Sequence, residues 1–244
     1  MKALRPIRQD ELAAFTDQLS RAFQGRPASR EWLERSRRLR ELDRTLAAFD
    51  DGALVATAAV ISFEVTVPGG LAPMAGVTAV SVLPTHRRQG LLRTLMRRQL
   101  DDIHERGEPL AGLWASEAPI YGRFGYGPAT YSASITIERH RGAFAVPFED
   151  PGRVLLATPE QARGAAPGAW EMLRRTQPGM LNRTDAHWDV QFEESEATRE
   201  RLGEQRCAIH ELAGSCLRAF LQLRGDCDSF HDAIVRGDAP SGIR

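Results

Sequence analysis

The sequence predicts an α/β fold with a mixed central sheet. Segments 45–49 and 53–67 are rich in Val, Ile, Thr and Phe and flank Asp51-Gly52, a dipeptide typical of the tight turn in an antiparallel hairpin. Further along, an apolar segment at 77–83, an amphipathic helix and a second apolar segment at 109–116 form a strand–helix–strand unit, which implies parallel pairing. A hairpin and such a unit in one stretch of chain predict a sheet that contains both kinds of pairing.

Composition and charge narrow the class of protein. The 244 residues include 32 basic and 32 acidic side chains, and 42% are hydrophobic, the profile of a globular chain with a buried core. A formal net charge of zero argues against a nucleic-acid binder, which normally carries a basic excess. The longest mostly apolar run, 53–63, is 11 residues and too short for a membrane span. Because the first 15 residues lack the apolar core of a secretory signal, we expect a cytoplasmic protein.

The N-terminal region is predicted to contain a strand and two helices. Residues 4–7 are predicted as a short strand, and apolar residues at helical spacing predict a helix over 11–23. A second helix is expected over 29–43, with Ser29 as its N-cap. The arginines of this second helix could bind phosphate, but a solvated face paired with nearby glutamates is favoured.

The strand–helix–strand unit contains the clearest helix in the sequence. Gly69-Gly70 is expected to end the hairpin, and a new strand is predicted over 77–83. The helix that follows carries a single apolar stripe, made of Leu92, Leu95, Met96, Leu100 and Ile103. Gly107 is expected to end that helix. Residues 109–116 are nearly all apolar and are predicted to form a strand buried on both faces.

The rest of the chain gives weaker signals. An alternating strand is predicted over 130–137, and residues 142–152 have the composition of a linker. A strand at 154–157, a helix near 170–175 and a short helix capped by Thr184 are predicted after it.

No metal site is predicted. The three cysteines Cys207, Cys216 and Cys227 lie in the last 38 residues, and no two are spaced as C-x-x-C, so they are interpreted as ordinary reduced thiols. The sequence also contains no Walker phosphate loop, no G-x-S-x-G elbow and no H-E-x-x-H.

The turn at 86–90 has the features of an anion site. It follows the strand at 77–83 and a helix begins directly after it, so the first N–H groups of the helix and its dipole favour a negative charge there. Gly90 lets the backbone approach a phosphate closely, and Arg87 and Arg88 add positive charge. From these residues alone, a phosphate site and a surface turn with solvated arginines are equally favoured.

The residues around this turn resemble those of a known family. Residues 80–91 read VSVLPTHRRQGL and resemble the acetyl-CoA loop of the GNAT N-acetyltransferases, whose pattern is Gln/Arg-x-x-Gly-x-Gly/Ala. Arg87 and Gly90 fit the pattern, and Leu92 departs from it at the last position.

The departure at Leu92 has a parallel in one branch of that superfamily. Together with WASE at 114–117 and IYGRFGYGPA at 120–129, it resembles the Eis (enhanced intracellular survival) branch. The resemblance is dense over 45–138 and looser as far as residue 193.

The resemblance implies a GNAT fold over 1–141, a partial second GNAT-like region over 153–244, and acetyl-CoA as the acyl donor. The strand containing Val80 would bind the pantetheine arm through its backbone, and residues 88–93 would hold the pyrophosphate. The cofactor-binding residues implied in this way are Val80, Ser81, Val82, Arg87, Arg88, Gln89, Gly90, Leu91, Leu92, Arg93, Ser116 and Glu117.

Tyr121 matches the tyrosine of the family that protonates the departing CoA thiolate. A primary amine attacks the thioester directly, and the leaving thiolate, whose thiol has a pKa of about 8.5, is assisted by a hydroxyl donor with a pKa of about 10. Without the resemblance, a packing role in a Gly-rich turn is the better interpretation of Tyr121. With it, Tyr121 is predicted to be the catalytic residue.

The implied reaction is acetyl transfer to a primary amine, either on an aminoglycoside-like small molecule or on a lysine side chain. Phe23 and Trp32 could line the acceptor site, but a core position is favoured for both.

Members of the Eis branch are longer than this chain. The resemblance implies a degenerate second GNAT domain and a sterol-carrier-like domain whose terminal carboxylate is the general base. Since the pattern leaves the family near Leu212, we expect a truncated member. Its incomplete second domain is expected to expose apolar surface around Trp170, Leu173 and Trp188 and so to favour homo-oligomers. The alternative function is an interaction protein that binds acetyl-CoA but turns over weakly.

Overall fold

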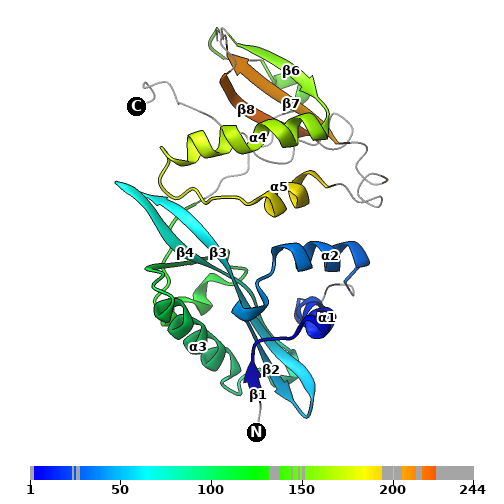
Figure 1. Cartoon of the computed structure of the whole chain (residues 1–244), viewed down its shortest axis with the longest axis vertical. Coiled ribbons are helices and arrows are strands. Elements are labelled where there is room, and N and C mark those ends of the chain that lie inside the picture. Colours follow the sequence, from blue (N-terminus) through cyan, green and yellow to red (C-terminus); the bar gives the residue numbers. More distant parts are fainter. Residues whose placement is uncertain are drawn as a thin grey trace. The chain divides into compact units, whose positions relative to one another are not determined.

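The computed structural model describes residues 3–23, 25, 28–131, 138–143, 145–147, 149, 152–193, 200, 205–212 and 216–223. The chain divides into two compact units, Met1–Ala129 and Thr130–Arg244 (Figure 1). The domain limits at residues 141 and 153 stay predictions.

The first unit is built on a five-stranded mixed sheet, as the sequence predicts. Its strands are β1 (Ala3–Arg5), β2 (Thr45–Asp50), β3 (Ala53–Val67), β4 (Gly70–Val82) and β5 (Leu110–Leu113), and they lie in that order. The first four pair antiparallel, and β5 pairs parallel to β4. The turn between β2 and β3 has positive φ at both Asp51 (47°) and Gly52 (81°), which confirms the predicted hairpin.

Three helices cover the two faces of this sheet: α1 (Leu12–Ala22), α2 (Arg30–Leu39) and α3 (Leu91–Glu105). Neighbouring residues of a strand point to opposite faces. Accordingly, Ala47 of β2 packs in one core cluster with Phe15 of α1, and Ala48 packs in another with Leu95 of α3. Figure 1 shows α1 and α2 on one side of the sheet and α3 on the other. Ser29 caps α2, because its hydroxyl accepts the N–H of Trp32 at 3.1 Å.

Two predicted strands differ from the structure. β4 begins at Gly70 and not at residue 77, because the hairpin arm continues through Gly76. Gly76 lies inside this strand, where a Cβ would lie 2.5 Å from the ring of Phe63, so glycine here permits close packing. The prediction that residues 109–116 are buried on both faces is wrong, since Leu110 is exposed and β5 is the last strand of the described sheet. Most of the predicted strand at 130–137 lies outside the described residues.

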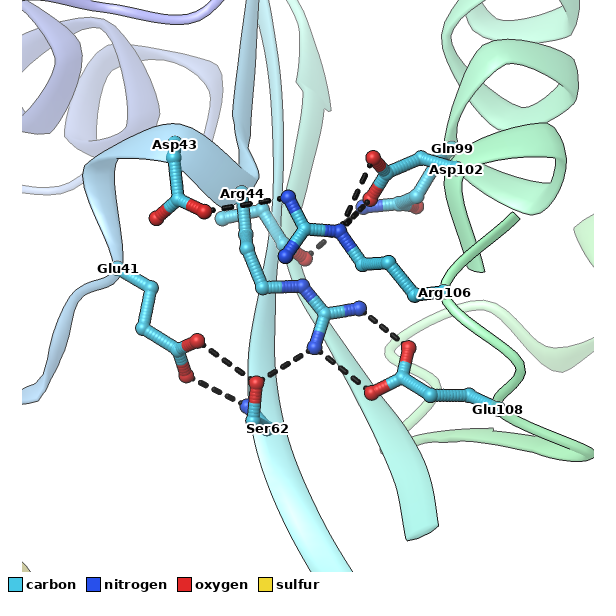
Figure 2. Close-up of polar contacts among 9 residues, drawn as sticks. Glu41, Asp43, Arg44, Ser62, Gln99, Asp102, Arg106 and Glu108 are labelled. Atoms are coloured by element: carbon cyan, nitrogen blue, oxygen red, sulfur yellow. Dashed lines mark hydrogen bonds and ion pairs between the residues drawn. The ribbon is translucent and has the colours of Figure 1, made fainter. Parts of the chain in front are cut away.

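A buried ion pair lies beside the sheet. The guanidinium of Arg44 makes two hydrogen bonds to the carboxylate of Glu108, and the two side chains are only 1% and 8% exposed. Arg44 also donates to the hydroxyl of Ser62 at 2.6 Å, and that hydroxyl donates to Glu41 at 2.7 Å (Figure 2). These contacts connect the segment before β2, strand β3 and the segment between α3 and β5.

The second unit contains a smaller antiparallel sheet, β6 (Arg153–Ala157), β7 (Arg206–Leu212) and β8 (Cys216–Leu223), and two helices, α4 (Pro159–Arg174) and α5 (Asp185–Phe192). Thr184 caps α5 as predicted, and α4 begins well before residue 170. The core includes Trp188, so the expectation that Trp188 lies at an exposed surface is wrong. The exposed apolar side chains of this unit include those of Val154 and Leu156 on β6.

Candidate active site

The site begins where β4 separates from β5. Parallel pairing between the two strands ends at Val77 and Leu113, while β4 continues to Val82. At this point Ala58 of β3 lies opposite two residues of β4, a β-bulge in which Ala79 has a positive φ of 52°. Among the described residues, no strand pairs with this last part of β4 on the side of β5. Backbone N–H and C=O groups of β4 can therefore bind an extended ligand there.

The turn after β4 leads directly into the N-terminus of α3. Arg88 (φ 61°) and Gly90 (φ 81°) both adopt left-handed backbone conformations, and α3 begins at Leu91. Gly90 is the N-cap, so no side chain caps the first N–H groups of the helix. Those N–H groups and the helix dipole favour an anion at this position, one of the two interpretations that the sequence left open.

His86 fixes this turn to the sheet. Its Nε2 lies 3.3 Å from the carboxylate of Asp50 at the end of β2, and its Nδ1 lies 2.8 Å from the hydroxyl of Thr85. These contacts give His86 a structural role in the loop.

A cavity of about 630 Å³ lies between the end of β4, the start of α3 and the segment around Tyr121. It brings together every predicted cofactor-binding residue except Gln89, whose side-chain amide donates to the carbonyl of Thr85 at 3.4 Å. We call this the donor cavity, after the acyl donor that the resemblance implies for its residues. The charged groups that line it are Arg87, Arg88, Arg93, Arg123 and Glu117, so its surroundings are cationic.

Arg123 and Phe124 also line the donor cavity, and sequence analysis did not select them as site residues. They belong to the same Gly-rich segment as Tyr121 and form a 3-10 helix directly after it. Their nearness to Tyr121 in the sequence was the signal that could have found them.

A second cavity of about 460 Å³ adjoins the donor cavity. It is lined by residues of α1, α2, β4 and the segment after β5, including Phe23, Trp32 and Trp114. We call it the acceptor cavity, after the acceptor site that the sequence analysis considered for Phe23 and Trp32. Phe23 is 56% exposed and Trp32 is 39% exposed, so the favoured core position for both is wrong. Among the described residues that line this cavity, none is charged.

Tyr121 lies at the junction of the two cavities, because it lines both of them together with Phe23, Val80 and Ser116. Burial raises the pKa of its hydroxyl above the ordinary value of 10, and the nearby carboxylate of Glu117 raises this pKa further. Tyr121 is therefore protonated at neutral pH and can donate a hydrogen bond or a proton.

Tyr126 is the other tyrosine in this segment. Its ring contacts that of Tyr121 edge to face, with the centroids 6.0 Å apart, and burial raises its pKa to about 12. Its buried hydroxyl has no hydrogen-bond partner among the described residues, and it lines neither cavity. Tyr121 is therefore the candidate proton donor and Tyr126 is not, because only Tyr121 lines the cavities.

The described residues contain neither a candidate metal site nor a membrane-spanning helix. No group of three or more His, Cys, Asp or Glu side chains in this part of the chain could hold a metal ion. None of its helices is long and apolar enough to cross a membrane.

Comparisons with known proteins identify the family to which this fold belongs. The family model of the acetyltransferase (GNAT) domain matches residues 3–129. An uncharacterized N-acetyltransferase of Streptomyces avermitilis is 41% identical over 214 residues, which make up 86% of this chain and 52% of that relative. The N-acetyltransferase Eis of Mycobacterium tuberculosis is 39% identical over 149 residues, 59% of this chain and 37% of that protein.

Among solved structures, Eis1 from Mycobacterium abscessus matches with a TM-score of 0.69 and 35% identity, over 92% of this chain and 53% of that one. The chain thus spans about half the length of these relatives.

The mixed sheet, its separated strands and the helix N-terminus beside them are those of an acetyltransferase of the GNAT class. With the matches above, the chain belongs to the GNAT acetyltransferase family, and within that family to its Eis-like branch.

Proposed function

We propose that this protein transfers an acetyl group from acetyl-CoA to a primary amine. The observation that carries the proposal is the separation of β4 from β5 next to the uncapped N-terminus of α3. In the donor cavity, the pyrophosphate of CoA binds the first N–H groups of α3 and the cationic side chains of Arg88 and Arg93. The pantetheine arm lies along the backbone of Val80–Val82.

The thioester lies at the junction of the two cavities in this proposal. The neutral amine enters from the acceptor cavity and attacks the thioester carbon, so that a C–N bond forms and the C–S bond breaks. The nitrogen loses one proton to water, the sulfur gains one from Tyr121, and Tyr121 regains one from water, so the protons balance. Tyr121 donates to the departing sulfur, and its raised pKa keeps it protonated for this role at neutral pH.

The acceptor binds between exposed aromatic rings. Phe23, Trp32 and Trp114 line the acceptor cavity, and exposed aromatic side chains gathered at one cavity favour ligand contact. Their faces attract an amine in its cationic form before it is deprotonated. An aminoglycoside-like amine and a lysine side chain are both candidates for this acceptor.

Two measurements test the proposal. Calorimetry with acetyl-CoA measures binding, and a free-thiol assay with a panel of primary amines measures turnover. We expect that the protein binds acetyl-CoA and that it releases free thiol only when an acceptor amine is present. Binding without turnover against the whole panel would favour an acetyl-CoA-binding interaction protein. No binding of acetyl-CoA would reject both functions.

A further inference from the structure

Three buried polar side chains connect α1, β3 and β4 beside the bulge. The hydroxyl of Ser81 on β4 donates to the amide oxygen of Gln18 on α1 at 2.9 Å, and it lies 2.7 Å from the hydroxyl of Thr57 on β3. The amide nitrogen of Gln18 donates to the carbonyl of Val55 at 3.2 Å. These three side chains are at most 7% exposed, so we call them the buried triad.

The triad holds the backbone at the point where the bulge occurs. The hydroxyl of Thr57 donates to the carbonyl of Ala79 at 2.7 Å, and Ala79 is the residue of β4 with a positive φ. A non-glycine residue in this conformation needs support from its surroundings. The bond from Thr57 provides such support and also satisfies a carbonyl that the bulge removes from the regular ladder.

The triad also connects the two cavities. Ser81 lines the donor cavity, and Gln18 is followed in α1 by Leu19 and Ser20, which line the acceptor cavity. Burying polar groups costs free energy unless they are hydrogen-bonded, and apolar side chains would fill the same space without this requirement. The placement of three polar side chains here therefore points to a geometric role.

We propose that Gln18 and Thr57 are positioning residues for acyl transfer. They fix the bulge so that the backbone groups of Val80–Val82 face the cofactor. They also fix the position of α1, which lines the acceptor cavity, relative to β4. This inference rests on the proposed function, since it assigns acetyl-CoA to the donor cavity.

Gln99 supplies a matched control for Gln18. It lies on α3, on the opposite face of the sheet, is 2% exposed, and donates its side-chain amide to a β3 carbonyl, that of Ala59, at 3.0 Å. Its hydrogen bond goes to β3 and not to β4, and like Gln18 it lines neither cavity. If the loss of any buried glutamine is enough to weaken cofactor binding, the Gln18 and Gln99 variants should show the same weakening.

The first experiment compares Gln18→Leu with Gln99→Leu in the full chain. Thermal melting should show that both variants lose a few degrees of stability. Calorimetry should show that Gln18→Leu weakens acetyl-CoA binding about tenfold, whereas Gln99→Leu changes it less than about twofold. Equal weakening in both variants, or unchanged binding in Gln18→Leu, overturns the proposal.

A second pair of variants, at Thr57, tests the proposal independently in case Gln18→Leu does not fold. Thr57→Val has nearly the shape of threonine without the hydroxyl, and Thr57→Ser keeps the hydroxyl. We expect weaker acetyl-CoA binding in Thr57→Val and recovery in Thr57→Ser. The same loss of affinity in both variants contradicts a role for the hydroxyl.

Hydrogen exchange without cofactor separates this proposal from the proposed function. The backbone amides of residues 79–82 should exchange faster in Thr57→Val than in Thr57→Ser and Gln99→Leu. If the parent chain does not bind acetyl-CoA, the proposed function fails, while the exchange data still decide whether the triad holds this strand. Equal exchange in these three variants overturns the positioning role.

Discussion

Tyr121 and Tyr126 form a natural comparison, because they are close together but only Tyr121 lines the cavities. We predict that Tyr121→Phe leaves acetyl-CoA binding unchanged and lowers turnover about 10²-fold, since only the proton donor is lost. Tyr126→Phe removes a buried hydroxyl that has no partner among the described residues and should retain normal turnover. Steady-state kinetics of both variants check this. Equal turnover in Tyr121→Phe and the parent would assign Tyr121 to packing.

Gly90 and Gly107 lie at the two ends of α3 and both have positive φ, 81° and 73°. We predict that Gly90→Asp and Gly107→Asp each cost about 1 kcal/mol of folding free energy because of backbone strain. Only Gly90→Asp should abolish acetyl-CoA binding, because its carboxylate would lie where the phosphates bind in the proposed function. Urea unfolding and calorimetry measure the two effects. Unchanged affinity in Gly90→Asp would rule out this phosphate site.

At the scale of the elements, Glu11 stabilises the connection between β1 and α1. It accepts two hydrogen bonds from Arg5, both at 2.7 Å, and one from the backbone N–H of Arg8 at 2.8 Å. These bonds, with that from Arg5 the largest contribution, lower the pKa of Glu11 from 4.5 to about 2. A lowered pKa in the folded state means that the stabilisation is complete above pH 4.5 and is lost as the pH falls towards 2.

The prediction concerns Glu11→Gln. The variant should be less stable than the parent at pH 7, and the difference should shrink between pH 4.5 and 2. Urea unfolding across this pH range measures it, with Glu34→Gln as a control from the exposed ion pair with Arg37. If Glu11→Gln and the parent differed in free energy of unfolding by the same amount at every pH, the lowered pKa of Glu11 would be contradicted.

The ion pair of Arg44 and Glu108 joins the segment before β2 to the segment after α3 (Figure 2). We predict that Glu108→Leu destabilises the chain by about 3–5 kcal/mol, because the charge of Arg44 stays buried without its partner. Adding Arg44→Met to this variant should recover part of the loss. Urea unfolding of both variants tests this, and a loss below about 1 kcal/mol in Glu108→Leu would show that the pair acts like an exposed one.

Sequence patterns predicted the elements whose signal is local. The stripe of α3, the turn at Asp51-Gly52 and the caps Ser29 and Thr184 are read from a few neighbouring residues, and the structure confirms them. β4 was predicted too short, because its first residues, 70–76, were not recognised as the second arm of the hairpin with β3. The close packing of Gly76 against the ring of Phe63 across the sheet has no local signal in the sequence.

In the site, too, features with a local sequence signal were predicted and features that depend on long-range packing were not. The turn at Gly90 and the segment of Tyr121 were found from their motifs, because a motif is contiguous. The positions of Phe23 and Trp32 at the acceptor cavity depend on how α1 and α2 pack against β4, and helical spacing alone does not specify this. The contacts of Gln18 with β4 have no local signal, since Gln18 and Ser81 are far apart in the sequence.

At the scale of the whole molecule, each unit has its own core, and every described residue that lines the two cavities belongs to the first unit. We predict that acetyl-CoA at 100 times its Kd stabilises the first unit by about 2.7 kcal/mol. Hydrogen exchange should show protection in α3 and β4 and little change in β6 and β7. Equal protection of both units would show that they unfold together.

The gap between β4 and β5 has a further consequence for the catalytic cycle. In the proposed function, acetyl-CoA occupies the place of a missing strand, so the sheet is completed when the cofactor arrives and interrupted again when CoA leaves. Each turnover then includes the making and breaking of a short backbone ladder. CoA leaves only after these bonds are exchanged for water, so the same geometry that aligns the thioester also sets a lower limit on the time the product stays bound.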